Sequence, residues 1–206
     1  PCPVVVINSG SFTADVPAVL SDNVEGGRLA TEHLLGLGHR KLAYISDTTT
    51  GNVAVRERLD GVRSAIEGSE AVVRVVAGDG HVEGAAKAGR EALERWPETT
   101  ALVCYNDLTA VGALRAIRST GLRVPRDVSV VGFDDIELAP YVDPPLTTVR
   151  QQTDEIGRWA VDTLIDAIAA GFETSERAAT GPDEQGVEPV RIAVELVVRD
   201  STGPVA

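Results

Sequence analysis

Short runs rich in β-branched residues alternate along this chain with amphipathic stretches of helical periodicity, and this alternation limits the possible folds more than any other feature. The predicted strands and extended segments are Val4 to Ile7, Lys41 to Ile45, Ala71 to Val76, Ala101 to Tyr105, Val128 to Val131, Leu146 to Val149 and Arg191 to Val198. The predicted helices are Asp22 to Leu37, Arg56 to Ile66, Val82 to Trp96, Leu108 to Ser119 and Thr153 to Ala170. Strands that alternate with helices are typical of parallel sheets covered by helices. The pattern therefore predicts an α/β fold.

Composition narrows the class of protein further. A chain of 206 residues with 43% hydrophobic residues can bury a sizeable core. No apolar run is long enough to span a bilayer, and the N-terminal residues contain no secretory signal pattern. The two cysteines, Cys2 and Cys104, are too few for a disulfide scaffold or a metal site, and we expect both to be buried. These features favour a cytoplasmic protein without membrane contact.

The charge balance argues against nucleic-acid binding by this chain itself. It carries 19 lysines and arginines against 31 aspartates and glutamates, which gives a formal net charge of −12. DNA binding derives much of its affinity from cationic groups that neutralise phosphates. Any contact with DNA is therefore expected to come from another part of the protein.

Polar residues follow the predicted strands at the points where these strands end. They are Asn8-Ser9, Ser46-Asp47, Gly78-Asp79, Asn106-Asp107 and Asp134-Asp135. In parallel sheets the ligand binds beyond the carboxyl ends of the strands. We expect Asp22 and Asp107 to act as helix caps, because aspartate is common at helix N-termini. The pair Asp134-Asp135 needs hydrogen-bond donors, which either the protein or a hydroxyl-rich ligand would supply.

An arginine near the start of a predicted helix completes this set. Arg56 is interpreted as a solvated surface residue, whereas Arg58 is a candidate to reach a cleft with its planar fork of donors. A guanidinium that faces carboxylates is suited to vicinal sugar hydroxyls.

The sequence gives little indication of catalysis. The three histidines lack metal-ligand spacing, and His33 is expected to pack on its helix while His39 is expected in a turn. No serine lies in a nucleophile elbow, and no phosphate-binding glycine loop is present. An enzyme that uses Asp134 and Asp135 with a divalent metal is an alternative, but a third ligand is not evident. We therefore expect no catalytic residues, no metal and no cofactor.

Five segments resemble one known family. The string from Val128 to Val149, VSVVGFDDIELAPYVDPPLTTV, is similar to the signature of the lactose-repressor/galactose-repressor transcription factors. Four further segments match in the same order, namely Thr31 to Arg40, Arg56 to Gly61, Asn106 to Arg115 and Glu195 to Arg199. Together they extend over nearly the whole chain.

This resemblance implies a periplasmic-binding-protein-like sensor with two lobes and a small-molecule effector in the cleft between them. It also implies homodimers that bind operator DNA through N-terminal helix-turn-helix heads, which this chain lacks. By the family layout, residues 1–21 and 151–186 form part of the N-terminal lobe, residues 22–150 and 187–200 form the C-terminal lobe, and residues 201–206 form a tail. The hinge would lie near Ser21, near Gln151 and in the loop before Arg191. The first lobe is expected to be incomplete, with exposed apolar surface.

The resemblance also implies the residues that contact the effector. They are Arg58, Asn106 and Asp134, with Asp22 and Gln151 near the lobe crossings. Asn8 stands where many members have aspartate, and Gly80 stands where many have an aromatic residue that stacks on the ligand. A polyhydroxylated ligand such as a sugar is therefore favoured over a purine. The alternative function is a solute-binding protein of a sugar transporter, although the run from Asp143 to Thr148 favours the regulator.

Overall fold

The computed structural model describes residues 2–8, 16–48, 52–169 and 188–205, and it contains a six-stranded sheet at the centre of its larger part. The strands lie in the order β4-β3-β5-β6-β7-β9. Their bounds are β3 (Lys41–Asp47), β4 (Val72–Gly78), β5 (Ala101–Cys104), β6 (Ser129–Asp134), β7 (Thr147–Gln151) and β9 (Val194–Val197). All neighbours pair in parallel except β7 and β9, which are antiparallel. The predicted α/β fold with mainly parallel sheets is confirmed.

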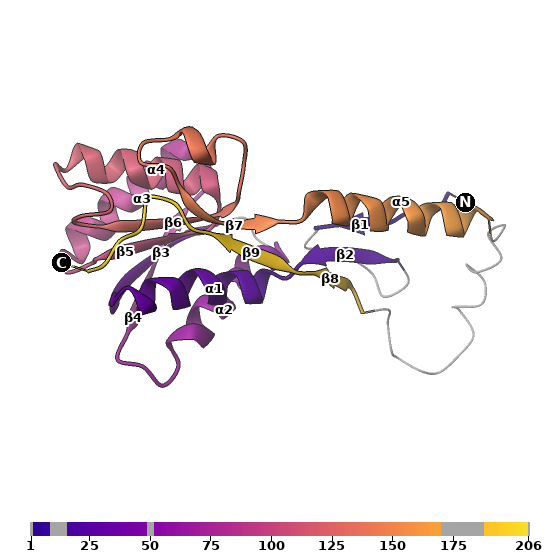
Figure 1. Ribbon diagram of the computed structural model, residues 1–206, viewed down its shortest axis with the longest axis horizontal. Coiled ribbons are helices and arrows are strands. Elements are labelled where there is room, and N and C mark those ends of the chain that lie inside the picture. Colours follow the sequence, from indigo (N-terminus) through magenta and orange to yellow (C-terminus); the bar gives the residue numbers. More distant parts are fainter. Residues whose placement is uncertain (1, 9–15, 49–51, 170–187, 206) are drawn as a thin grey trace.

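Helices cover both faces of this sheet, as Figure 1 shows. The helices α1 (Asn23–Gly36) and α2 (Val53–Ile66) pack together on one face, and α3 (Val82–Arg95) and α4 (Asp107–Ser119) pack together on the other. A short 3-10 helix, η1 (Ala139–Tyr141), lies between β6 and β7. Because both faces are covered, the inner residues of β3, β5 and β6 are mainly hydrophobic and do not alternate with polar residues.

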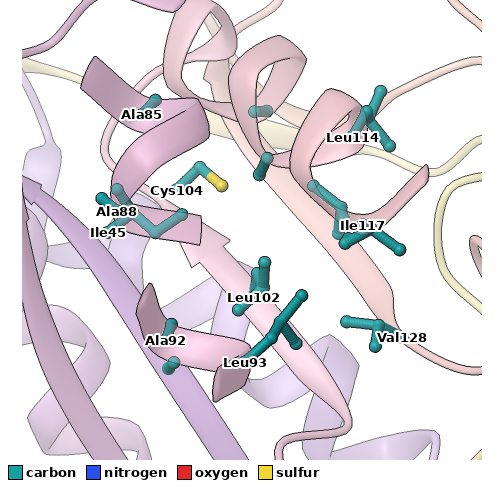
Figure 2. Close-up of a cluster of buried hydrophobic side chains, with 14 of the residues drawn as sticks. Ile45, Ala85, Ala88, Ala92, Leu93, Leu102, Cys104, Leu114, Ile117 and Val128 are labelled. Atoms are coloured by element: carbon teal, nitrogen blue, oxygen red, sulfur yellow. The ribbon is translucent and has the colours of Figure 1, made fainter. Parts of the chain in front are cut away.

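The core is divided into two layers by the sheet. On the α3 and α4 side, Ile45 and Leu102 of the sheet meet Leu93 and Ile117 of the helices (Figure 2). On the other side, Tyr44 and Val103 meet residues of α1 and α2. Consecutive residues of one strand thus face opposite layers, as the pleat of a strand requires. Cys104 belongs to the first layer, but Cys2 is exposed, contrary to the expectation that both cysteines are buried.

A second, smaller sheet extends from one end of the molecule (Figure 1). It contains β1 (Val6–Ile7), β2 (Ala18–Ser21) and β8 (Val190–Ile192) in the order β1-β2-β8, with α5 (Thr153–Ala169) packed against it. No strand was predicted at the position of β2. Most of the predicted loop from Gly171 to Pro189 lies outside the described residues.

One predicted strand is two strands in different sheets. The sequence predicted a single strand from Arg191 to Val198, but β8 pairs with β2 in the small sheet and β9 pairs with β7 in the large one. The chain therefore changes sheets at Ala193 and not in the loop before Arg191. The hydrophobic pattern is continuous across Ala193, so sequence periodicity gives no signal of this break.

The C-terminal residues pack against the large sheet. The Ser201 hydroxyl donates a hydrogen bond to the Val130 carbonyl (2.7 Å) and accepts one from the Thr147 backbone N–H (2.8 Å). His39 is buried between Thr100 (3.0 Å) and the Gly203 carbonyl (2.9 Å), so it is not the simple turn residue that the sequence predicted. Burial lowers the pKa of His39.

Apolar side chains are exposed on α5, the helix that the sequence assigned to the N-terminal lobe. Val161, Ile165 and Ile168 follow one another at helical spacing, and each is more than half exposed. The exposed apolar surface expected there is present. In the described parts of the chain, no helix combines the length and the hydropathy needed to cross a membrane.

Candidate functional site

Polar side chains from both sheets meet where the strands end. Arg58 Nη1, on the first half of α2, lies 3.5 Å from Asp134 Oδ1 at the end of β6. Gln151, the last residue of β7, donates from Nε2 to the same Asp134 oxygen at 2.6 Å. The Gln151 Oε1 atom accepts hydrogen bonds from Asn8 Nδ2 (3.1 Å) and Ser21 Oγ (2.5 Å) in the small sheet. Four strand ends and one helix thus converge, as expected for ligand sites in open parallel sheets.

Arg58 is held in a fixed plane inside this cluster. Its side chain is only 8% exposed, and its guanidinium lies 3.6 Å from the centroid of the Phe133 ring. Arg58 Nη1 donates to the Tyr105 carbonyl (2.7 Å), and Nε donates to Asn23 Oδ1 (3.0 Å). Cation–π contact and directed hydrogen bonds orient a guanidinium far better than solvent does. Arg58 thus reaches the acidic end of β6, while its contact with an effector stays a prediction. Arg56 is exposed as predicted.

The two adjacent aspartates have different roles. Asp135 is 7% exposed and is held by protein donors, Arg150 Nε (2.6 Å) and Arg199 Nη2 (2.7 Å). Asp134 retains 28% of its side chain exposed, and its backbone has a φ of 121°, a conformation that L-residues adopt at a cost. Burial raises the pKa of Asp134, although the Arg58 charge opposes this shift. Of the two carboxylates, Asp134 is therefore the more accessible.

Asn106 and Asp22 both act as helix caps. Asn106 Oδ1 accepts from the Thr109 backbone N–H (2.8 Å) and caps α4, and its Nδ2 donates to the Gly80 carbonyl (3.3 Å). Asp22 Oδ1 accepts from the Glu25 backbone N–H (3.0 Å) and caps α1, as the sequence predicted. Asn106 directly follows Tyr105, whose carbonyl contacts Arg58, so it lies next to the cluster. Effector contact by either residue stays a prediction.

Asp107 has a different role from the cap that the sequence predicted. It is fully buried, and its two oxygens accept from the Thr148 hydroxyl (2.5 Å) and from the Ile136 backbone N–H (2.9 Å). It therefore ties the start of α4 to β7 and to the turn that follows Asp134. A Cβ atom at Gly132 would overlap this carboxyl group, so only glycine fits there. Burial raises the pKa of Asp107 to about 7, against the lowering effect of its two hydrogen bonds.

We expect Asp107→Asn to remove a pH dependence of stability. Because the pKa of Asp107 is about 7 when folded and about 3.9 when unfolded, the folded state keeps a proton that the unfolded state releases. The stability that Asp107 contributes is thus complete below about pH 4 and is lost as the pH rises to about 7. Urea unfolding measures the free energy of unfolding of Asp107→Asn relative to that of the parent chain. Between pH 4.5 and 8 this difference should shift in favour of the variant by a few kcal/mol, on the order of 1.4 kcal/mol per pKa unit. A gain that is independent of pH, or equal to that of the exposed control Asp143→Asn, would contradict this.

Several residues of the cluster were not predicted from the sequence. Ser21, Asn23, Tyr105 and Phe133 contact the predicted site residues, yet none of them follows a pattern that distinguishes it from a capping or core residue. Within the described ranges, no group of three His, Cys, Asp or Glu side chains could hold a metal ion. The polar groups present are suited to hydrogen bonding of a neutral, hydroxyl-rich molecule.

Comparison with known proteins places this architecture in a family. Residues 31–202 match the family described as a periplasmic binding protein-like domain. The transcriptional regulator CelR of Thermobifida fusca is 40% identical over 187 residues, which cover 87% of this chain and 50% of that protein. The chain belongs to the lactose-repressor/galactose-repressor family.

Solved structures of this family superpose on nearly all of the chain. A LacI family regulator from Enterococcus faecium with bound ribose has a TM-score of 0.83 at 27% identity and covers 99% of this chain and 72% of its own. A CelR–cellobiose complex has a TM-score of 0.79 at 36% identity, and the match covers 96% of this chain and 58% of the CelR chain. The lac repressor dimer bound to operator has a TM-score of 0.79 at 29% identity, and the match covers 98% of this chain and 65% of the lac repressor chain. The chain spans about half the length of the curated relatives it matches.

Proposed function

We propose that this chain is the effector-sensing part of a sugar-responsive transcriptional repressor and has no catalytic role. The observation that carries the proposal is the convergence of Arg58, Asp134 and Gln151 where the two sheets meet. The family relationship supports a regulator over the alternative, a solute-binding protein of a transporter. As a transcriptional regulator it would act in the cytoplasm.

The chemistry of the cluster is suited to sugar hydroxyls. A hydroxyl both donates and accepts, so vicinal hydroxyls can donate to the Asp134 carboxylate while they accept from a neighbouring amide or guanidinium. Among the described residues, both protein contacts of Asp134 involve Oδ1, which leaves Oδ2 for the ligand. Asn8, Asn106 and Asp22 would add amide and carboxylate groups around the same ligand.

We assign the two sheets to two lobes. Residues 1–21 and 151–186 would belong to the N-terminal lobe, and residues 22–150 and 187–200 to the C-terminal lobe, except that β8 pairs with β2 and would move to the N-terminal lobe, with the crossing at Ala193. A sugar in the cleft would favour one lobe orientation, and its differential affinity for the two orientations would set the size of the response. In the homodimer this change would alter the spacing of N-terminal DNA-binding heads on a palindromic operator.

Binding of sugars to the purified chain tests the proposal. Titration calorimetry with cellobiose and with D-ribose, the ligands of two related structures, should give saturable binding to one of them. Hypoxanthine serves as the purine control and should not bind. Saturable binding of hypoxanthine without binding of either sugar, or no binding of any of the three to well-folded chain, would overturn the proposal.

The genomic form of the protein provides a second test. If the encoded protein carries a helix-turn-helix head, operator retention in gel shifts should change with the sugar that binds. A secretory leader in its place would instead support the transporter receptor.

A further inference from the structure

Arg58 is the last of a series of hydrogen-bonded polar side chains that begins at Arg191 in the small sheet. Its Nε atom donates to Asn23 Oδ1 at 3.0 Å. The Asn23 amide in turn donates from Nδ2 to Glu57 Oε2 at 3.1 Å. Arg191 of β8 donates two hydrogen bonds to the Glu57 carboxylate, from Nη2 to Oε1 at 2.7 Å and from Nη1 to Oε2 at 3.3 Å. Asn23 and Glu57 are thus each hydrogen-bonded to both of their neighbours in this series.

Glu57 is an unusual residue for its position. It is next to Arg58 on α2, and its side chain is only 11% exposed. A carboxylate removed from water is costly unless it is paired and hydrogen-bonded, so its partners are required and not incidental. The paired charge is Arg191, which lies in the small sheet, where β8 pairs with β2. The bidentate geometry fixes both distance and angle between the two elements.

Asn23 links the Glu57–Arg191 ion pair to the orientation of Arg58. Its Nδ2 faces the Glu57 carboxylate, so its Oδ1 must face Arg58 Nε. If Glu57 lost its charge or its place, the amide could turn and present a donor to another donor, which would break the Arg58 contact. The angle of the guanidinium at Asp134 therefore depends on the position of Glu57.

We propose that Asn23, Glu57 and Arg191 are positioning residues. They make the orientation of the Arg58 guanidinium depend on the position of β8. This inference rests on the proposed function, because it assigns the three residues to the sensing site. The ion pair connects the segment just before the sheet crossing at Ala193 to the residue that faces the ligand. A shift of the small sheet is thereby transmitted to Arg58 through three side chains in direct contact, Arg191, Glu57 and Asn23, and sugar binding is transmitted back by the same contacts.

The orientation of the Arg58 guanidinium can be followed by NMR without any sugar. The buried Nε–H of Arg58 should give a protected 15N–1H signal, assigned by its disappearance in Arg58→Lys. In Glu57→Gln and Arg191→Met this signal should shift and exchange faster, whereas Arg63→Gln should leave it unchanged. Arg63 is the matched control, because it lies on the same helix, is 58% exposed and is 3.7 Å from Asp60. An unchanged Arg58 signal in Arg191→Met would overturn the positioning role.

Sugar affinity then tests the coupling. With cellobiose and D-ribose as probes, Arg191→Met should weaken binding about tenfold, and Arg191→Lys should restore most of the loss. A merely structural role would lower the unfolding temperature in Arg191→Met without changing the dissociation constant. A shifted Arg58 signal with unchanged affinity for a sugar that binds would therefore refute the coupling.

The change in the small sheet can be followed by fluorescence. The chain has two tryptophans, and Trp159 lies on α5 against the small sheet. In a Trp96→Phe background, the bound sugar should change Trp159 emission, and Arg191→Met should abolish that change at saturating sugar. If neither sugar binds the well-folded parent chain, the proposed function fails, while the Arg58 signal still decides the positioning role.

Discussion

Asp134→Asn is expected to weaken sugar binding by about 30- to 1000-fold, because removing one charged partner of a buried hydrogen-bonded set costs about 2–4 kcal/mol. Asparagine has the same shape, and its oxygen can still accept from Arg58 and Gln151 in place of Oδ1. The second position becomes an NH2 group, which cannot accept from a sugar hydroxyl. The protein contacts are thus kept while the ligand contact is lost.

Titration calorimetry with cellobiose and D-ribose, together with thermal unfolding, measures this effect. The control is Asp60→Asn, since Asp60 is a surface carboxylate on α2 that pairs with Arg63 at 3.7 Å. We expect Asp134→Asn to unfold within a few degrees of the parent chain. An unchanged dissociation constant in this variant would remove Asp134 from the site.

Arg58→Ala is a less clean test of the site than Asp134→Asn. Arg58 is buried and donates to Asn23 and to the Tyr105 carbonyl. Alanine would leave those acceptors unpaired at about 1–3 kcal/mol each. We therefore expect Arg58→Ala to lower stability as well as affinity.

Gly61→Ala is expected to destabilise the fold by about 3 kcal/mol or more, because it would force two helix backbones apart. A Cβ atom at position 61 would overlap the Val24 carbonyl oxygen and lie 2.9 Å from the Arg28 backbone nitrogen. On the facing helix, a Cβ atom at Gly27 would overlap the Arg58 carbonyl oxygen. The helices α1 and α2 thus meet backbone to backbone, and neither surface can yield by rotating a side chain.

Urea and thermal unfolding followed by circular dichroism measure the loss. For a chain of this size, 3 kcal/mol corresponds to a decrease in Tm of about 6–12 °C. Gly157→Ala in α5 is the matched control, because nothing lies within 4 Å of its added Cβ atom. That variant should be neutral or more stable by up to about 1 kcal/mol. Equal unfolding temperatures for Gly61→Ala and the parent chain would contradict the close helix contact.

The Gly61 variant also bears on the site. Arg58 is one turn before Gly61 on α2, so separation of the helices would move Arg58 away from Asn23 of α1. We expect the surviving folded fraction to bind sugar more weakly than the parent chain. Stability and affinity are therefore linked at this contact.

Several features of the fold were predictable because neighbouring residues carry them. Helices and strands repeat at their own periods, and so α1 to α5 and the parallel strands of the large sheet were found within a few residues. The polar residues at strand ends were also readable, since all parallel strands end at one edge. This local order placed Asn8 and Asp134 at the same edge and made Arg58 a candidate, whereas Gln151 was added only by the resemblance to the family. Which of them contacts the effector stays a prediction.

What the sequence by itself determined was the alternation of elements, the charge and the set of polar groups at the strand ends. Only the tertiary structure decided that the last strand divides at Ala193, that Asp107 is buried rather than a cap, and that Glu57 pairs with Arg191. The physical reason is distance along the chain. Asn8 meets Gln151 and Glu57 meets Arg191 across more than 130 residues, and such contacts arise from how the elements pack and which groups lose water, neither of which leaves a periodic trace in the sequence.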